Sequence, residues 1–434
     1  MPENESMNPS TTDTVTPETA GQNGMLRLSV LSALGMIPVE NATIVISYTG
    51  DPSTPLMTLT TDNSGQTQSI TLPAPLRALS LDPETGTQPY AEYNILITAE
   101  GYEPVVISGS QIFSGELALQ PVVMNPSEAP SAPSSEEEKR IIIPVHTLFG
   151  DYPPKIPEEE IKPIEDRGEI VLSRVVIPEY IIVHDGVPGD NTATNYWVRY
   201  KDYIKTVASC EIYSTWPEAA IYANILAIMS FTLNRVYTEW YRNQNYPFTI
   251  TSSTAYDQKW VYGHNIFQNI DILVDTIFAN YLARPGVRQP IFTAYCDGTR
   301  TTCNGLSQWG SKYLAEEGYS AIEILRYYFG NDLYIATADI ISGVPSSYPG
   351  YALGIGSSGD KVRQLQNQLN RIARNFPAIP ILTTDGIYGP RTAESVRIFQ
   401  KIFGLPATGI TDYPTWYEIS DIYVGVSRIA EPGR

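Results

Sequence analysis

The pattern of hydrophobic and polar positions changes several times along the chain. Residues 1–24 contain almost no aliphatic side chains, which is typical of a disordered tail. Between residues 25 and 125, short runs such as MLRLSVLSAL and YNILITAEGY alternate apolar and polar positions and are separated by Gly, Pro, Asn and Asp. Alternation of period two with turn residues between the runs predicts an all-β sandwich at the N-terminus.

Residues 126–167 have the composition of a linker. PSEAPSAPSSEEEKR and DYPPKIPEEEIKPIEDRG are rich in Pro, Ser and Glu, and they flank one short apolar island, IIIPVHTLF. Stretches of this kind are extended and open to proteases. We predict an acidic, Pro-rich linker or pro-segment here, with an activating cleavage between Pro126 and Pro178.

Residues 168–335 combine helical and strand patterns and predict an α+β domain. IPEYIIVHDGVP predicts an edge strand, and NYWVRYKDYIKTVASCEIYSTWP predicts a helix. The run from Ala219 to Leu233 is apolar nearly all around, which is typical of a central buried helix. Thr215 and Glu218 have the spacing of a capping box at the start of that helix. Glu211 then lies in the connection between the two helices, where its carboxylate leads into the core.

A short linker, residues 336–352, precedes a small α-helical domain at residues 353–424 and a tail at residues 425–434. Two amphipathic helices predict the core of this domain, with apolar faces at Val362, Leu365, Leu369 and Ile372 and at Ala393, Val396, Phe399 and Phe403. The glycine-containing turns between them complete a pattern that resembles the peptidoglycan-binding repeat of many wall-lytic enzymes. The resemblance implies binding through Asp385, Tyr388, Arg391 and Trp416, although each of these residues fits a cap or core role equally well.

Composition and charge restrict the partners. With 47 acidic and 28 basic residues the net charge is −19, which argues against nucleic acid and against an anionic membrane surface. The N-terminus has neither a basic start nor an apolar core, so no signal peptide is recognisable. The longest apolar run contains Tyr222, Asn224, Ser230 and Thr232 and is interpreted as a buried helix, so we expect no transmembrane segment.

Two blocks in residues 168–335 resemble the SpoIID family, whose members cleave or help to cleave peptidoglycan during sporulation. The first block carries Glu211, then Trp216-Pro217 and an Ala-rich helix; the second carries Gly305, Ser307-Gln308-Trp309-Gly310 and an aromatic pair before Gly330. The order of the domains is similar to that of clostridial spore cortex-lytic zymogens. The resemblance therefore implies a SpoIID-like catalytic domain that acts on peptidoglycan of the spore cortex, in the cortex or coat region, after cleavage by a subtilisin-like germination protease.

Carried over onto this sequence, the family's catalytic acid falls on Glu211. Apolar and aromatic neighbours disfavour ionisation and would let the side chain donate a proton to a glycosidic oxygen. Ordinary glycosidases need two carboxylates, whereas a lytic transglycosylase needs one, because the muramic 6-hydroxyl attacks within the sugar. A second carboxylate from Asp202, Asp257 or Asp297 stays an alternative. Trp216, Ser307, Gln308 and Trp309 are candidate substrate-binding residues, with a core role the alternative for Trp309.

Three questions stay open at this point. Cys296 and Cys303 could bind zinc with His264, form a disulfide or remain free buried thiols; we favour free thiols and expect no required cofactor. Cys210 has no neighbour that would lower the pKa of its thiol. The middle domain could also be a non-catalytic wall-binding enhancer of an amidase, or cleave the bond between muramic acid and alanine itself. The main expectation is a lytic transglycosylase.

Overall fold

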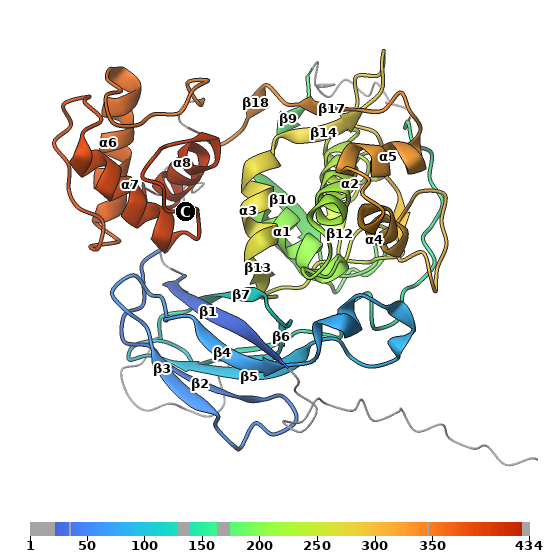
Figure 1. Ribbon diagram of the computed structural model, residues 1–434, viewed down its shortest axis with the longest axis horizontal. Coiled ribbons are helices and arrows are strands. Elements are labelled where there is room, and N and C mark those ends of the chain that lie inside the picture. The colour runs from blue at the N-terminus through green and yellow to red at the C-terminus, as the bar shows by residue number, and fades with distance from the viewer. Residues whose placement is uncertain (1–21, 34–35, 128–138, 163–173, 345–346, 428–434) are drawn as a thin grey trace, which may run out of the picture.

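The computed structural model describes residues 22–33, 36–127, 139–162, 174–344 and 347–427. Three parts follow one another along the chain: a β-rich part, a middle domain of helices and small sheets, and a helical C-terminal domain (Figure 1). The middle and C-terminal parts lie side by side against the β-rich part. The predicted multidomain order, with a β-rich N-terminal region and a small helical C-terminal region, is confirmed.

Two sheets form the N-terminal sandwich. The first has the order β13-β7-β1-β4 and the second the order β3-β2-β5-β6-β8. Buried residues alternate with more exposed ones along β1 and β5, as the period-two pattern predicts. The strands and the two short 3-10 helices after β4 are β1 (Gln22–Ser32), β2 (Thr43–Tyr48), β3 (Met57–Thr60), β4 (Ile70–Ala74), η1 (Arg77–Ser80), η2 (Pro83–Thr85), β5 (Ala91–Thr98), β6 (Val105–Ile112) and β7 (Leu117–Met124).

Two strands of these sheets come from outside residues 25–125. β8 (Lys139–Ile142), from the predicted linker, pairs in parallel with β6. β13 (Ile266–Phe267), from the middle domain, pairs antiparallel with β7. The sandwich is therefore joined by backbone hydrogen bonds to both later segments.

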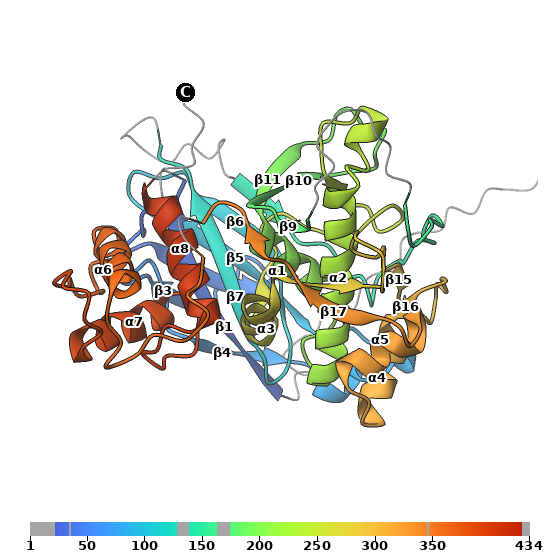
Figure 2. The ribbon, with the colours of Figure 1, turned by 90° about the horizontal axis from the view of Figure 1, so that it is seen from above.

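The middle domain is built around α2 (Glu218–Tyr237), which is buried on nearly every side, as predicted (Figure 2). Within the described residues, α2 is also the one helix long and apolar enough to cross a membrane, and most of it is buried inside the fold. The other elements are β9 (Val176–Ile177), β10 (Tyr180–His184), β11 (Asn195–Arg199), α1 (Tyr200–Glu211), η3 (Arg242–Gln244), β12 (Ile250–Thr251), α3 (Gln268–Ile277), β14 (Asn280–Ala283), β15 (Tyr295–Cys296), β16 (Leu306–Ser307), α4 (Gln308–Glu316), α5 (Ala321–Phe329), β17 (Tyr334–Thr337) and β18 (Ile340–Ile341).

Several predicted details of this domain are wrong. β10 lies in the centre of the sheet β11-β10-β12, not at its edge, and the predicted first helix starts as a strand, β11, before α1. The capping box does not form: α2 begins after Pro217 without a side-chain cap, and the Thr215 hydroxyl donates instead to Ser80 Oγ of the sandwich at 2.6 Å. A tertiary contact has replaced the local one.

The C-terminal domain contains α6 (Asp360–Ala373), α7 (Pro390–Ile402) and α8 (Tyr413–Ser427). The first two helices bury the apolar faces that the sequence predicts. α8 continues three residues beyond the predicted end at 424 and lies beside α3 of the middle domain in both ribbon views. The ammonium of Lys201 on α1 binds the carboxylates of Glu418 and Asp421 on α8, at 2.5 and 2.9 Å.

The predicted boundaries shift elsewhere as well. β1 begins at Gln22, inside the predicted tail, while residues 1–21 lie outside the described residues. The predicted linker 336–352 contains β18, which pairs with β9. In the predicted linker 126–167, residues 128–138 and 163–167 are outside the described residues, as is the part of the predicted cleavage region that falls in 163–173. Residues 143–162 between them form an ordered segment, here called the strap.

Candidate functional site

Glu211 is the last residue of α1, and its side chain has an exposed fraction of 0%. The helix stops because Ile212 adopts an extended backbone, which turns the chain toward α2. Three donors from separate segments hold the carboxylate: the backbone N–H of Lys259 at 2.7 Å, the Tyr295 hydroxyl at 3.3 Å and the Gln308 amide at 3.2 Å. The same amide also donates to the Glu211 carbonyl oxygen at 3.1 Å. The carboxylate therefore has a defined position rather than a free rotamer.

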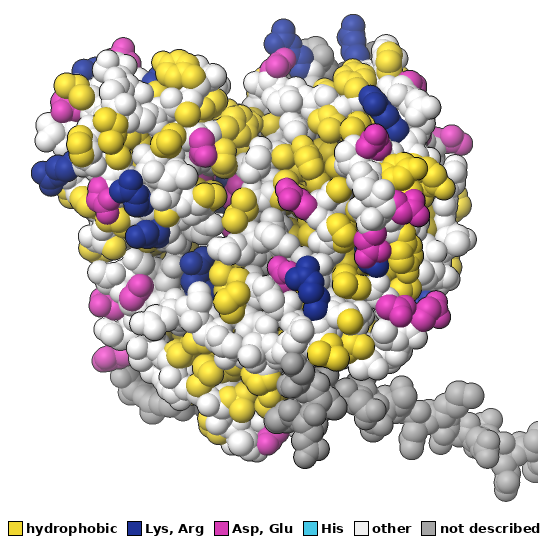
Figure 3. All heavy atoms as spheres, viewed as in Figure 1, with side chains coloured by type: hydrophobic (Ala, Val, Ile, Leu, Met, Phe, Trp, Pro, Cys, Tyr) yellow, Lys and Arg dark blue, Asp and Glu magenta, His cyan; other side chains and the backbone are white. Residues whose placement is uncertain are grey.

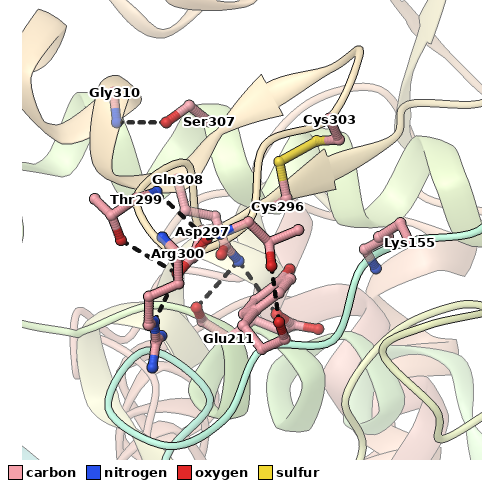
Figure 4. The surroundings of a disulfide bond; sticks show 12 residues. Lys155, Glu211, Cys296, Asp297, Thr299, Arg300, Cys303, Ser307, Gln308 and Gly310 are labelled. Carbon is pink, nitrogen blue, oxygen red and sulfur yellow. Dashed lines mark hydrogen bonds and ion pairs between the residues drawn. A yellow bond between two sulfur atoms is a disulfide. The ribbon is translucent and has the colours of Figure 1, made fainter.

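The donors are fixed by the short strand pair β15–β16. Tyr295 lies opposite Leu306 in this parallel pair, and Gln308 follows directly as the first residue of α4. Cys296 and Cys303 form a disulfide that closes the loop between the two strands (Figure 4). The expectation of free thiols at these positions is thus wrong. Burial raises the pKa of the Tyr295 hydroxyl well above its ordinary value, and the Glu211 charge acts in the same direction, so Tyr295 is a hydrogen-bond donor at neutral pH.

The other predicted substrate-binding residues of this domain make contacts within the protein itself. The Ser307 hydroxyl caps α4 by accepting from the Gly310 N–H at 2.9 Å. Trp216 and Trp309 are 3% and 2% exposed, and their rings contact each other at a tilt of 57° with centroids 5.0 Å apart. The Trp216 indole N–H donates to the Ser80 carbonyl at 3.0 Å. In this arrangement the sandwich covers the Trp216 ring, while the Trp309 ring borders a cavity between the sandwich and the middle domain.

Gly305 and Gly310 do allow close approach, but of protein atoms. A Cβ on Gly305 would lie 2.0 Å from the Ala294 carbonyl oxygen, and one on Gly310 would lie 2.0 Å from the Tyr328 hydroxyl. The glycines of the second block therefore pack the chain behind Gln308 and Trp309.

The three aspartates considered as second carboxylates are engaged or distant. Asp257 pairs with Arg235 at 2.7 Å and accepts from the Tyr241 hydroxyl at 2.6 Å. Asp297 pairs with Arg300 at 2.8 Å. Asp202 lies in the first turn of α1, nine residues and about 14 Å of helix from Glu211. Glu211 differs from them because neutral donors, not an arginine, hold it.

The strap passes over this site. The guanidinium of Arg235 binds Glu158 through two hydrogen bonds of 2.7 and 2.6 Å, and Arg284 binds Glu160 through two more. Backbone bonds reinforce these ion pairs: the Ile156 N–H donates to the Ala255 carbonyl at 2.9 Å, and the Phe292 N–H donates to the Glu160 carbonyl at 3.0 Å. The strap is thus docked along its length on the middle domain.

The start of the strap packs directly beside the α1–α2 turn. The His146 ring contacts the Tyr213 ring, with centroids 4.7 Å apart, and Arg300 donates to the Thr147 and Gly150 carbonyls. Burial, with a smaller contribution from His264, lowers the pKa of His146 to about 3. A cavity of about 250 Å³ remains where strap, sandwich and middle domain meet next to Tyr213 and Trp309.

His264 is not near enough to the cysteines to act with them in this structure. Its Nδ1 bonds the Asn265 carbonyl at 2.6 Å, and burial lowers the pKa of its imidazole to about 4. Across the residues that the structure describes, no group of three His, Cys, Asp or Glu side chains could hold a metal ion. Cys210 is buried, and burial raises the pKa of its thiol far above the ordinary value, as its apolar surroundings predict.

The four candidate residues of the C-terminal domain divide into two buried and two exposed. Tyr388 and Trp416 are 0% and 1% exposed, and the Tyr388 hydroxyl donates to the Gly409 carbonyl at 3.0 Å. These two are core residues and cannot contact a ligand in this structure. Asp385 and Arg391 are exposed; Asp385 also accepts from the Ile387 N–H at 2.9 Å and so supports its own turn.

Sequence reasoning missed several residues around Glu211. Tyr295 stands inside the second SpoIID-like block, next to Cys296, and that position was the available signal. Lys259 acts through its backbone N–H, for which no side-chain pattern exists. Lys155 and Glu158 lie in a stretch that reads as a linker, so only the three-dimensional structure brings them to the site.

Comparisons with known proteins bear mainly on the C-terminal domain. Residues 358–419 match the family described as a peptidoglycan binding domain, which indicates cell-wall association. No curated protein matches the chain. The SpoIID resemblance of residues 168–335 is not supported by a match and stays a prediction.

Similar solved structures cover only parts of the chain. The Bacillus anthracis TIE protein is 15% identical, with 24% of this chain and 17% of that chain covered at a TM-score of 0.18. The Streptococcus agalactiae minor pilin GBS52 is 17% identical, with 26% of this chain and 48% of that chain covered at a TM-score of 0.19. Klebsiella pneumoniae 5-hydroxyisourate hydrolase is 18% identical, with 24% of this chain and 91% of that chain covered at a TM-score of 0.17. The chain spans less than half the length of the first two, and such TM-scores carry no functional argument.

Proposed function

We propose that this chain is the latent form of a peptidoglycan-cleaving enzyme, with Glu211 as its acid and base and the strap as its inhibitory segment. The observation that carries the proposal is the state of Glu211. It is a fully buried carboxylate, oriented by three neutral donors from separate segments and covered by a segment of composition unlike that of a domain core.

The proposed reaction is a lytic transglycosylation. Protonated Glu211 gives its proton to the glycosidic oxygen after N-acetylmuramic acid, and the bond from that oxygen to the anomeric carbon breaks. The muramic 6-hydroxyl oxygen then attacks the anomeric carbon, and its proton returns to the Glu211 carboxylate. The products are a new glycan end and a 1,6-anhydro-muramic end, and no water is consumed. One carboxylate suffices, which agrees with the engagement of Asp257 and Asp297 by arginines.

Covering by the strap and the sandwich supports latency. Buried polar atoms near Glu211 stay without a partner among the described residues, notably Gln308 Oε1, Trp309 Nε1 and the Tyr152 hydroxyl. These donor and acceptor atoms are available to bind the hydroxyl and amide groups of a sugar once the strap has moved.

The pairing of the strap with the sandwich also bears on where the activating cut falls within the predicted cleavage region. β8 joins the strap to the sandwich sheet, so a cut within residues 163–173 would free sandwich and strap as one body. A cut within residues 128–138 would leave the strap joined to the middle domain. We therefore place the activating cut after the strap, and propose a subtilisin-like germination protease as the enzyme that makes it.

The C-terminal domain would hold the enzyme on its polymer. Its match to the peptidoglycan-binding family supports peptidoglycan as the partner. The spore cortex as the site of action, and germination as the occasion, rest on the resemblance to cortex-lytic zymogens. Neither nucleic acid nor membrane is proposed as a partner, given the net charge of −19.

Mass spectrometry of released muropeptides tests the reaction. The chain would carry a specific protease site within residues 163–173 and would be applied, cut and uncut, to decoated spores. We expect anhydro-muramic products from the cut chain, at least tenfold fewer from the uncut chain, and none from cut Glu211→Gln. Glu218→Gln is the matched control, because Glu218 is exposed at the first position of α2, directly after Pro217, and its substitution should leave the products unchanged.

Other products would point to the alternatives. New free alanine amino groups would indicate an amidase, and release only in the presence of a separate amidase would indicate an enhancer. Lysis that Glu211→Gln leaves unchanged would refute the role of Glu211.

A further inference from the structure

Lys155 of the strap places its ammonium group against aromatic rings of the candidate site. Its ammonium lies 4.6 Å from the centre of the Tyr295 ring and 5.8 Å from that of Phe231, and it donates to the Asp257 carbonyl. Tyr295 is the residue whose hydroxyl binds Glu211. Figure 4 shows Lys155 on the strap beside the cluster formed by Glu211, Gln308 and the disulfide loop.

The charges around this ammonium explain why a cation is held there. Burial lowers the pKa of Lys155 below its ordinary value, while the charges of Glu211 and then of Asp257 act in the opposite direction and favour the protonated form. Arg235 already pairs with Asp257 and Glu158, so its charge is balanced nearby. The Glu211 carboxylate has neutral hydrogen-bond donors, and the Lys155 ammonium lies over the ring of one of them, Tyr295, close enough for its charge to act on Glu211.

Cleavage of a glycosidic bond generates positive charge in this same place. The transition state of glycoside cleavage resembles an oxocarbenium ion, with the charge on the ring oxygen and the anomeric carbon, close to the catalytic carboxylate. An aromatic face and a carboxylate together favour a cation over a neutral group. Lys155 places a positive charge on the face of Tyr295, the residue whose hydroxyl binds Glu211.

We propose that the Lys155 ammonium occupies the subsite in which the positively charged sugar ring forms, and that this subsite binds cations selectively. The inference rests on the proposed function, since it identifies the subsite with the reacting sugar. It makes the strap an internal mimic of the transition state rather than a simple cover. The ligand class for the opened site is a sugar analogue with a positively charged ring nitrogen.

Chemical rescue in the full chain tests the cation subsite without using lysis. Lys155→Ala removes the equivalent of n-propylammonium, and the readout is hydrogen exchange of the Ile156 amide, which is bonded to the Ala255 carbonyl. We expect faster exchange in Lys155→Ala and in the isosteric Lys155→Met. Propylammonium chloride should slow exchange in Lys155→Ala roughly 2- to 30-fold more than 1-propanol at equal concentration and ionic strength.

Lys155→Ala combined with Glu211→Gln is the matched control, in which the preference of ammonium over alcohol should disappear. Equal rescue by 1-propanol, or Lys155→Met with a strap as protected as in the parent chain, would overturn the proposal. Persistence of the ammonium preference after Glu211→Gln would also overturn it.

A second measurement separates this inference from the proposed reaction. An N-acetylmuramic acid analogue with a protonated ring nitrogen should bind the cut chain at least tenfold more tightly than N-acetylmuramic acid, as measured by calorimetry. Absence of anhydro products with a positive rescue result would reject the reaction and retain the cation subsite. Anhydro products with equal binding of both sugars would retain the reaction and reject the subsite.

Discussion

Glu158→Gln gives the sharpest test of how the strap is held. The Glu158 carboxylate binds Arg235, whose side chain is 0% exposed, and also the ammonium of Lys162 at 2.6 Å. Burial would raise the pKa of Glu158, but hydrogen bonds and charge from Arg235 and Lys162 outweigh it, and the pKa falls below its ordinary value. The substitution leaves both cations with one ionic partner fewer.

The expected size follows from the burial of this pair. Removing one partner of a buried ion pair costs about 3–5 kcal/mol, and the lower figure applies because Arg235 keeps Asp257. At about 1.4 kcal/mol per tenfold, strap opening should increase by roughly two orders of magnitude. Glu160→Gln is the matched control: Glu160 also binds an arginine through two bonds, but its side chain is 33% exposed, so we expect less than about a fivefold effect.

Hydrogen exchange of the Ile156 and Lys162 amides measures this opening. Ile156 donates to the Ala255 carbonyl and Lys162 to the Gln289 side chain, so both amides are protected only while the strap is docked. Because the folded-state pKa of Glu158 is depressed, its contribution is present above its unfolded value near pH 4.3 and is lost as the pH falls through the folded value. Equal exchange rates in Glu158→Gln and Glu160→Gln would refute the conclusion that Glu158 makes the main contact holding the strap.

Two further perturbations test other parts of the same assembly. Burial is the main cause that lowers the pKa of His146 to about 3 and of His264 to about 4, and all three histidines of the chain are at most 5% exposed, in agreement with the absence of histidine side chains on the face in Figure 3. The contribution of His146 and His264 should therefore be full above pH ~6.5, and the free energy of unfolding should fall by about 1.4 kcal/mol per pH unit for each of these two residues below it. Denaturant titrations should show a flatter pH dependence in His146→Gln/His264→Gln than in the parent chain, and parallel curves would contradict the reasoning. Reduction of Cys296–Cys303, or Cys303→Ser, should lower the free energy of unfolding by about 2.5 kcal/mol, as expected for a loop of this length, and should speed exchange at the strap residues bound by Arg300; unchanged urea midpoints with and without reductant would contradict it.

Much of the architecture follows from local patterns. Period-two alternation in residues 25–125 predicted the β-rich part, because one face of each strand must be buried. The run of small and aliphatic residues after Pro217 predicted the central helix, and the two amphipathic faces predicted α6 and α7. Each of these signals depends on neighbours within a few residues, and a local pattern is enough to encode it.

Pairing between distant segments was beyond the reach of such patterns. Thr215 has the spacing of a cap yet bonds Ser80, 135 residues away, and Cys296 and Cys303 carried no signal that chose a disulfide over free thiols. β8 and β13 are too short to be recognised as strands, and they exist because sandwich strands offer open edges to them.

The sequence by itself determined that Glu211 precedes a buried helix and that the C-terminal domain has the pattern of a wall-binding repeat. The tertiary structure alone decided that Tyr295, Gln308 and the Lys259 N–H hold the carboxylate. It also decided that two residues of an apparent linker are bound nearby, Lys155 on the Tyr295 ring and Glu158 on the buried Arg235. The physical reason is that a linker-like composition of Pro and Glu cannot bury a core of its own. It becomes ordered where its first residues pack beside Tyr213 and where Arg235 and Arg284 supply the charges that its carboxylates bind.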